Sequence, residues 1–141
     1  MPDVLPSMQW ILRDECLELL AGDVVGRLAV VTGRAPVIFP VNYILDGSDI
    51  VFRTDPGTKL DAGPRAPACF EIDEVDRETH TGWSVVATGR LEEITTYDSE
   101  TWKRVHALPV EPWAKGGKAH WMRLIPDRIT GRRIGPARPR G

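Results

Sequence analysis

Short apolar segments rich in β-branched residues, each bounded by turn-forming residues, recur along most of this chain. Runs of this kind predict β-strands rather than helices, because they are short and end at Gly, Pro or Asp. Helical spacing of apolar residues occurs before the first of these segments and again between the fifth and the sixth. The predicted strands are residues 26–32, 36–45, 49–54, 66–75, 83–94, 120–126 and 128–134.

Turn residues support this division into strands. Gly33-Arg34 separates the first two strands, and Asp46-Gly47 is a strong signal for a tight hairpin. Pro40 lies inside a predicted strand, where it cannot donate a backbone hydrogen bond, so it marks an edge, a bulge or a bend.

The helices and the chain ends complete the prediction. Residues 13–21 and 99–107 have helical spacing, and a third short helix remains open after Gly57. We expect residues 1–12 to form an irregular N-terminal arm and residues 135–141 a disordered tail. Six or seven short strands with two or three peripheral helices predict a mainly β fold of the barrel type, in one domain over residues 13–134.

Composition narrows the function. The chain has 141 residues and a formal net charge of −2, so we expect no general attraction to nucleic acid. No stretch is long enough to span a membrane, and the first residues lack a signal-peptide pattern, which favours the cytoplasm. Cys16 and Cys69 lie among apolar neighbours, and we expect both to be reduced thiols.

Several common functional motifs are absent from the sequence. There is no GxGxxG, no GxxxxGK[ST], no HExxH, no CxxC pair and no GxSxG. His80, His106 and His120 lie far apart without ligand spacing, so we expect no metal site.

One cluster has the chemistry of a phosphate site. Arg53-Thr54 ends a strand, Pro56-Gly57 forms a turn, and Thr58-Lys59 opens the next segment. A guanidinium, two hydroxyls and an ammonium within one turn of chain are the donors that a phosphate needs. The alternative is a solvated hairpin end whose charges bind nothing.

The order of several segments resembles the pyridoxamine 5′-phosphate oxidase-like flavoproteins. These segments are GRLAVV, PVIFPVNY, DIVFRTDPGTKL, ACFEID and GWSVVATGRLEEI, and the resemblance covers about residues 13–134. The branch that it resembles includes nitroimidazole-resistance proteins and small actinobacterial flavin or deazaflavin binders. The resemblance implies a split β-barrel that forms a homodimer, with FMN in a cleft between the subunits.

The resemblance also implies roles for particular residues. The strand around Pro40, Val41, Asn42 and Tyr43 would run beside the isoalloxazine ring. The phosphate would be held by Phe52, Arg53, Thr54, Thr58 and Lys59. Trp83 and Arg90 would reach the flavin from the partner subunit. For Trp83 plain interface packing is the alternative, and for Arg90 a surface ion pair.

Two departures limit the activity that can be inferred. Pyridoxamine phosphate oxidases end with an arginine–histidine pair that grips the substrate phosphate, whereas residues 129–134 here contain no histidine. Nitroimidazole-resistance proteins are associated with a histidine near the PVNY strand, and residues 37–39 have none. Neither vitamin B6 oxidation nor drug reduction is therefore expected.

The sequence thus predicts an FMN-dependent oxidoreductase that acts on an unknown small molecule, with the redox chemistry supplied by the flavin. No catalytic residue is assigned, since Tyr43 serves equally well as a proton donor or as a wall residue.

Three different functions are compatible with the same fold. A deazaflavin cofactor would use Arg53, Lys59 and the Lys115–Lys118 loop for its longer acidic tail. A non-catalytic dimer would bind flavin, haem or lipid, and an empty structural dimer would bind none of them. For any dimer we expect one face of residues 83–88 to meet the partner.

Overall fold

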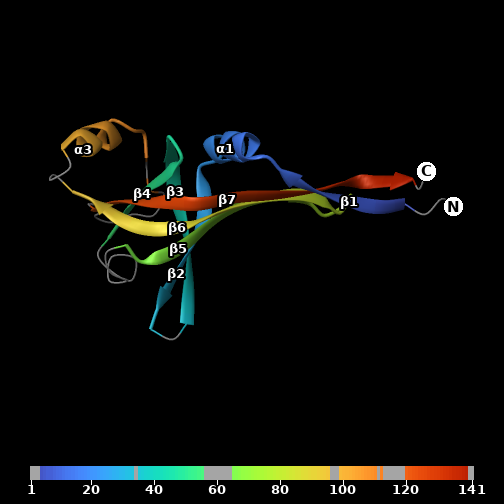
Figure 1. The fold of residues 1–141 in the computed structure, drawn as a ribbon, viewed down its shortest axis with the longest axis horizontal. Helices are drawn as coiled ribbons and strands as arrows, with labels where there is room; N and C mark the ends of the chain where they lie inside the picture. Colours follow the sequence, from blue (N-terminus) through green and yellow to red (C-terminus); the bar gives the residue numbers. More distant parts are fainter. Residues whose placement is uncertain are drawn as a thin grey trace.

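The structure is a computed structural model that describes residues 4–33, 35–55, 65–95, 99–110, 112 and 120–139. Seven strands and two helices lie in this part of the chain (Figure 1). In chain order they are β1 (Val4–Ile11), α1 (Arg13–Ala21), β2 (Val25–Thr32), β3 (Ala35–Asp46), β4 (Asp49–Thr54), β5 (Pro67–Asp76), β6 (Thr81–Ile94), α3 (Ser99–His106) and β7 (His120–Pro139).

All strands pair antiparallel in one sheet, in the order β1-β7-β4-β3-β2-β5-β6. A further pairing of β6 with β7 bends the sheet back on itself, so six strands form a ring and β1 lies outside it along the far part of β7. The predicted mainly β fold is confirmed, and the arrangement is that of a split barrel. Figure 1 shows the long strands β5, β6 and β7 running out of the barrel as an extended arm towards the two termini.

Both predicted hairpin turns are present. Gly33 has φ 60° and Gly47 has φ 64°, a left-handed conformation that glycine adopts without a steric penalty. Asp46 pairs with Asp49, so Gly47 and Ser48 form a two-residue loop between β3 and β4.

The two chain ends differ from the prediction. The sequence predicts an irregular arm over residues 1–12, but Val4–Ile11 is a strand paired with residues 131–139 of β7. The expected disordered tail is likewise in β7 as far as Pro139. Neither of these two chain ends has a strong strand pattern of its own. They form strands because each one provides the backbone hydrogen-bond partners of the other. Pro6 is accommodated where the register shifts between Pro6 and Met8.

The last two predicted strands form a single strand in the structure. Residues 120–126 and 128–134 belong to the continuous strand β7, and the prediction of a break at Asp127 was wrong. The register with β6 changes there, from Gly89 opposite Pro126 to Thr88 opposite Arg128. Asp127 is therefore an extra residue in β7, a β-bulge that interrupts the pattern without ending the strand.

The apolar side chains form two separate clusters. The larger cluster fills the barrel around Phe52, Phe70 and Leu28, and α1 closes it with Cys16 and Leu20. The smaller cluster lies between α3 and the outer face of β4 and β7. Its buried members are Val51, Ile94, Val105, Val110 and Trp121.

Both cysteines are free thiols, as predicted. Cys16 is buried, and burial raises the pKa of its thiol. No helix in the described residues has the length and apolar character needed to cross a membrane. The same residues contain no group of three or more His, Cys, Asp or Glu side chains placed to hold a metal ion.

Candidate functional site

The β3 residues expected beside the flavin ring divide between two faces of the sheet. Val41 and Tyr43 point into the barrel core, while Pro40 is exposed and Asn42 is half-buried. The Asn42 side-chain amide donates a hydrogen bond to the Val24 carbonyl over 3.4 Å. Of these four residues, Pro40 and Asn42 are thus the two whose side chains lie on the outer face of β3.

Tyr43 is a wall residue of the barrel. Its hydroxyl donates a hydrogen bond to the Leu20 carbonyl at 2.5 Å, and its ring packs edge-on against Phe70 with centroids 4.7 Å apart. Burial raises the pKa of the phenol far above its usual value. Of the two roles left open by the sequence, this geometry supports packing and gives no support to proton donation.

The β4 residues expected at the phosphate also alternate. Phe52 is fully buried in the barrel, and Thr54 is buried with its hydroxyl donating to the Asp55 carbonyl at 3.1 Å. Arg53 is half-buried on the outer face, with its guanidinium carbon 5.2 Å from the centre of the Trp121 ring. Arg53 is therefore the side chain of β4 that presents positive charge at the outer surface.

Some of the predicted residues cannot be placed. Thr58, Lys59 and the Pro56-Gly57 turn lie outside the described residues, as does the Lys115–Lys118 loop. The structure thus gives the position of Arg53, but not that of the second cation in the predicted phosphate cluster.

Trp83 and Arg90 lie on β6 and do not meet each other. Seven residues of extended strand, about 23 Å, separate them. Trp83 is half-buried against the barrel core. Arg90 is exposed and donates a hydrogen bond to the Arg65 carbonyl at 3.0 Å. Arg65 has φ 60°, so Arg90 holds a strained backbone position just before β5. Within one subunit, Trp83 and Arg90 are therefore too far apart to contact the same part of a ligand.

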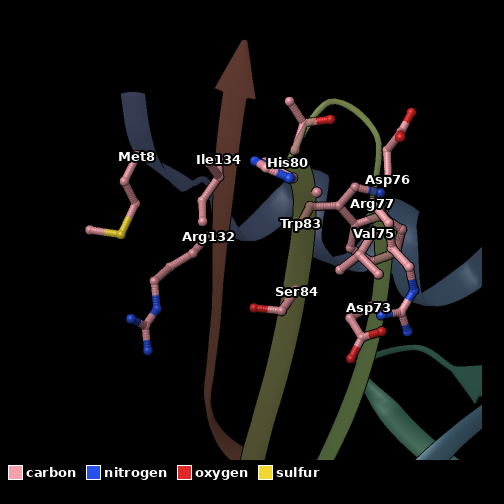
Figure 2. A pocket seen from close by; sticks show the side chains of 12 residues that line it. Met8, Asp73, Val75, Asp76, Arg77, His80, Trp83, Ser84, Arg132 and Ile134 are labelled. Atoms are coloured by element: carbon pink, nitrogen blue, oxygen red, sulfur yellow. The ribbon is translucent and has the colours of Figure 1, made fainter. Parts of the chain in front are cut away.

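A pocket that the sequence did not predict lies on the arm, where the β5–β6 hairpin meets β1 and β7. Figure 2 shows the side chains that line it. The pocket is open to solvent on one side and has a volume of about 410 Å³. The apolar wall consists of Met8, Val75 and Ile134, all of which are exposed. The remaining lining residues are Asp73, Asp76, Arg77, His80, Thr81, Gly82, Trp83, Ser84 and Arg132.

The acidic groups of this pocket already have partners. Asp73 forms an ion pair with Arg27 at 3.1 Å. Asp76 accepts backbone N–H bonds from Glu78 and Thr79 at 2.9 and 3.2 Å, and these bonds lower its pKa.

The basic side chain opposite them has a different contact. The guanidinium of Arg132 lies over the Trp10 ring at 5.6 Å, and no carboxylate pairs with it among the described residues. An apolar wall beside a cation suits a partner or ligand that carries both apolar surface and negative charge.

The sequence gives little sign of this pocket, because residues 1–12 look irregular on their own. Of the lining residues, only Trp83 is among the predicted site residues. The alternation of Met8 and Trp10, two large apolar residues two positions apart and followed by Ile11, is the available strand signal.

Comparison with known proteins adds the family. Residues 12–133 match the family model described as pyridoxamine 5′-phosphate oxidase. An uncharacterized Mycobacterium tuberculosis protein is 32% identical over 128 residues, which cover 86% of this chain and 82% of that protein.

Two solved structures are also similar. The FAD binding protein from Mycobacterium smegmatis is 32% identical with a TM-score of 0.76, covering 90% of this chain and 100% of that one. A FAD-binding protein from Mesorhizobium loti shares the fold at 24% identity and a TM-score of 0.72, covering 92% of this chain and 98% of that one. The family match over nearly the whole chain agrees with the ring of six strands and the order of the sequence segments. This chain therefore belongs to the pyridoxamine 5′-phosphate oxidase family, whose fold is a flavin-binding split barrel.

Proposed function

We propose that this protein is a cytoplasmic flavin-dependent oxidoreductase that binds FMN, works as a homodimer and acts on a small molecule. The observation that carries the proposal is the position of Arg53 on the flavin-binding fold of the pyridoxamine 5′-phosphate oxidase family. Arg53 is a half-buried cation on the outer face at the end of β4, shortly before the Thr58-Lys59 segment. When bound, the flavin supplies the redox chemistry, and this chain's residues anchor and orient it.

FAD is a second candidate cofactor, because the M. smegmatis protein with 32% identity is named for FAD binding. A deazaflavin and haem are further candidates. Titration of the purified protein with FMN, FAD, riboflavin, a deazaflavin and haem, followed by fluorescence or absorbance, separates them. We expect FMN to bind most tightly. Tighter binding of FAD or of a deazaflavin would replace FMN in the proposal, and binding of haem alone would contradict it.

Turnover separates an oxidoreductase from a storage or sensing protein. We expect the FMN-loaded protein to accept electrons from a reduced nicotinamide faster than free FMN does, measured as bleaching of the flavin absorbance under anaerobic conditions. An identical rate with and without the protein would favour a non-catalytic flavin binder.

We predict that Arg53→Ala and Lys59→Ala each weaken FMN binding by about ten- to a hundredfold and leave riboflavin binding nearly unchanged. A charge-assisted contact to phosphate contributes about 1.5–3 kcal/mol, and riboflavin has no phosphate. The dissociation constants of both ligands are measured for each variant.

Lys115→Ala and Lys118→Ala are the matched controls, because they remove the same kind of charge from a different loop. A larger loss from these two variants than from Arg53→Ala and Lys59→Ala would place the charged end of the cofactor elsewhere. The long-tailed deazaflavin would then be the better candidate.

Exposed apolar side chains support the homodimer. On the arm, Met8, Trp10, Val75 and Ile134 are 58, 65, 62 and 44% exposed around the pocket. On the β2–β3 hairpin, Val31 and Ile38 are 59 and 66% exposed. Val85 and Ala87 point into the barrel, so the outer set of Ser84, Val86 and Thr88 is the one that faces a partner. Apolar surface of this extent is typical of an association site.

We predict a dimer by light scattering at micromolar concentration, and a shift towards monomer in Ile134→Lys. An ammonium placed on the apolar wall would be buried on association in the pocket that already holds the guanidinium of Arg132, a like charge. Leu12→Lys is the control, since Leu12 is 79% exposed and does not line the pocket. A monomeric unsubstituted protein, or equal effects of both substitutions, would argue against this interface.

A further inference from the structure

Three aromatic rings stand in a row beside Arg53. Arg53 on β4 is the register partner of Trp121 on β7, and its guanidinium lies 5.2 Å from the Trp121 ring centre. The Trp121 and His106 ring centroids are 4.5 Å apart, and those of His106 and Trp102 are 3.7 Å apart. The row Trp102–His106–Trp121 therefore leads from α3 to the guanidinium.

The Trp121 ring is held in place by its surroundings. It is only 6% exposed and belongs to the small cluster under α3 with Val51, Ile94 and Val105. Nδ1 of His106 lies 2.8 Å from the Trp102 carbonyl, which fixes the imidazole on the last turn of the helix. The neighbouring apolar side chains leave the indole little freedom to change rotamer.

Helix α3 is itself anchored to the barrel. Arg104 forms an ion pair with Asp46 at 3.0 Å, which ties the helix to the β3–β4 hairpin. Val105 of the helix is fully buried against Val51 and Trp121 of the smaller cluster. The rings on α3 are thus fixed relative to β4, the strand that carries Arg53.

We propose that Trp121, supported by His106, is a positioning residue that orients the Arg53 guanidinium for the phosphate of the cofactor. This inference rests on the proposed function. A cation–π contact with an indole face restrains a guanidinium, and it does not use the N–H groups that bond phosphate oxygens. A guanidinium restrained before binding loses less side-chain entropy when the phosphate arrives. Trp121 therefore contributes to FMN affinity through Arg53, without contacting the cofactor.

The test measures the ratio of the riboflavin and FMN dissociation constants in four variants. Arg53→Ala removes the anchor, Trp121→Leu removes the ring that contacts Arg53, Trp121→Phe retains an aromatic face, and His106→Ala removes the supporting ring. We expect Trp121→Leu to lower the ratio by about three- to tenfold. Trp121→Phe should restore most of the ratio, and His106→Ala should lower it less than Trp121→Leu.

A double-mutant cycle distinguishes positioning from a general loss of structure. In the Arg53→Ala background, Trp121→Leu should change the ratio no further, because the group that it positions is absent. An equal loss of FMN and riboflavin affinity in Trp121→Leu and in His106→Ala would overturn the inference, because a damaged fold affects both ligands. His106 is exposed, so its substitution keeps the test valid if Trp121→Leu does not fold.

The two proposals fail in different ways. If Arg53→Ala lowers the ratio while His106→Ala and Trp121→Leu leave it unchanged, the phosphate site stands and the positioning role is wrong. If Arg53→Ala leaves the ratio unchanged, both the phosphate site at Arg53 and the role of Trp121 are wrong.

Discussion

Phe70→Ala is expected to lower the free energy of unfolding by about 3–5 kcal/mol, the usual range for removing a large buried aromatic side chain. Phe70 is fully buried at the centre of the barrel cluster. Its ring contacts Tyr43 edge-on and lies so near Gly26 that a Cβ there would be 2.2 Å from the ring. Urea unfolding followed by circular dichroism measures the loss.

The matched control for this substitution lies on the same strand. Glu74 is exposed near the far end of β5, and Glu74→Ala should change the free energy of unfolding by less than about 0.5 kcal/mol. Similar losses for the two variants would mean that the barrel interior does not carry the stability of the fold.

The barrel strands could be predicted from the sequence because their signals are local. β2 to β6 each combine β-branched or aromatic residues with turn residues at their ends, and the Asp46-Gly47 pair marks one hairpin directly. The two predicted helices agree with α1 and α3 to within one residue at each end. Each of these elements could be recognised without knowing what it packs against.

The arm could not be predicted in this way, because its strands depend on each other. Residues 4–11 and 135–139 contain prolines, and their apolar and polar residues alternate only weakly. They form strands because β1 pairs with the last part of β7. The pocket at Arg132 lies where the β5–β6 hairpin meets β1 and β7, and the sequence does not predict it because it does not predict that β1 pairs with β7. A segment whose hydrogen bonds all go to a partner distant in sequence gives little local signal.

The candidate site was predicted as a set of residues, but not as side-chain directions. The period of two in a strand places the side chains of Val41 and Tyr43 inside the barrel, so Pro40 and Asn42 are the members of this motif with side chains on the outer face. The same period leaves Arg53 outside between the buried Phe52 and Thr54. Inward and outward positions therefore separate the packing residues of the motif from those able to meet a ligand.

The bulge at Asp127 lies opposite Gly89 and changes the faces of β7. Before the bulge, Met122 and Leu124 face the barrel core, and after it Ile129 and Gly131 do so. The extra residue thus reverses which positions of β7 face inward. On the first part of the strand this leaves Trp121 on the outer face, where it contacts Arg53 and α3.

Gly89→Ala should therefore destabilise the protein strongly, with a loss of about 3 kcal/mol in the free energy of unfolding, the upper end of the usual range for overpacking. A Cβ at this position would lie 1.9 Å from the Ile125 carbonyl oxygen and 2.7 Å from its carbon. Both atoms belong to the backbone beside the bulge, so they cannot rotate away as a side chain would. Urea denaturation measures the loss.

Gly22→Ala is the control for this change, because a Cβ there would meet only ordinary contacts of 3.5 Å and its φ of −90° suits any residue. We expect the free energy of unfolding of Gly22→Ala to be close to that of the unsubstituted protein. Since the bulge also sets the direction of Trp121, the remaining folded fraction of Gly89→Ala should bind FMN with a lower preference over riboflavin. A Gly89→Ala variant with unchanged stability would show that β7 can straighten at Asp127, and the reversal of its faces would then not depend on this glycine.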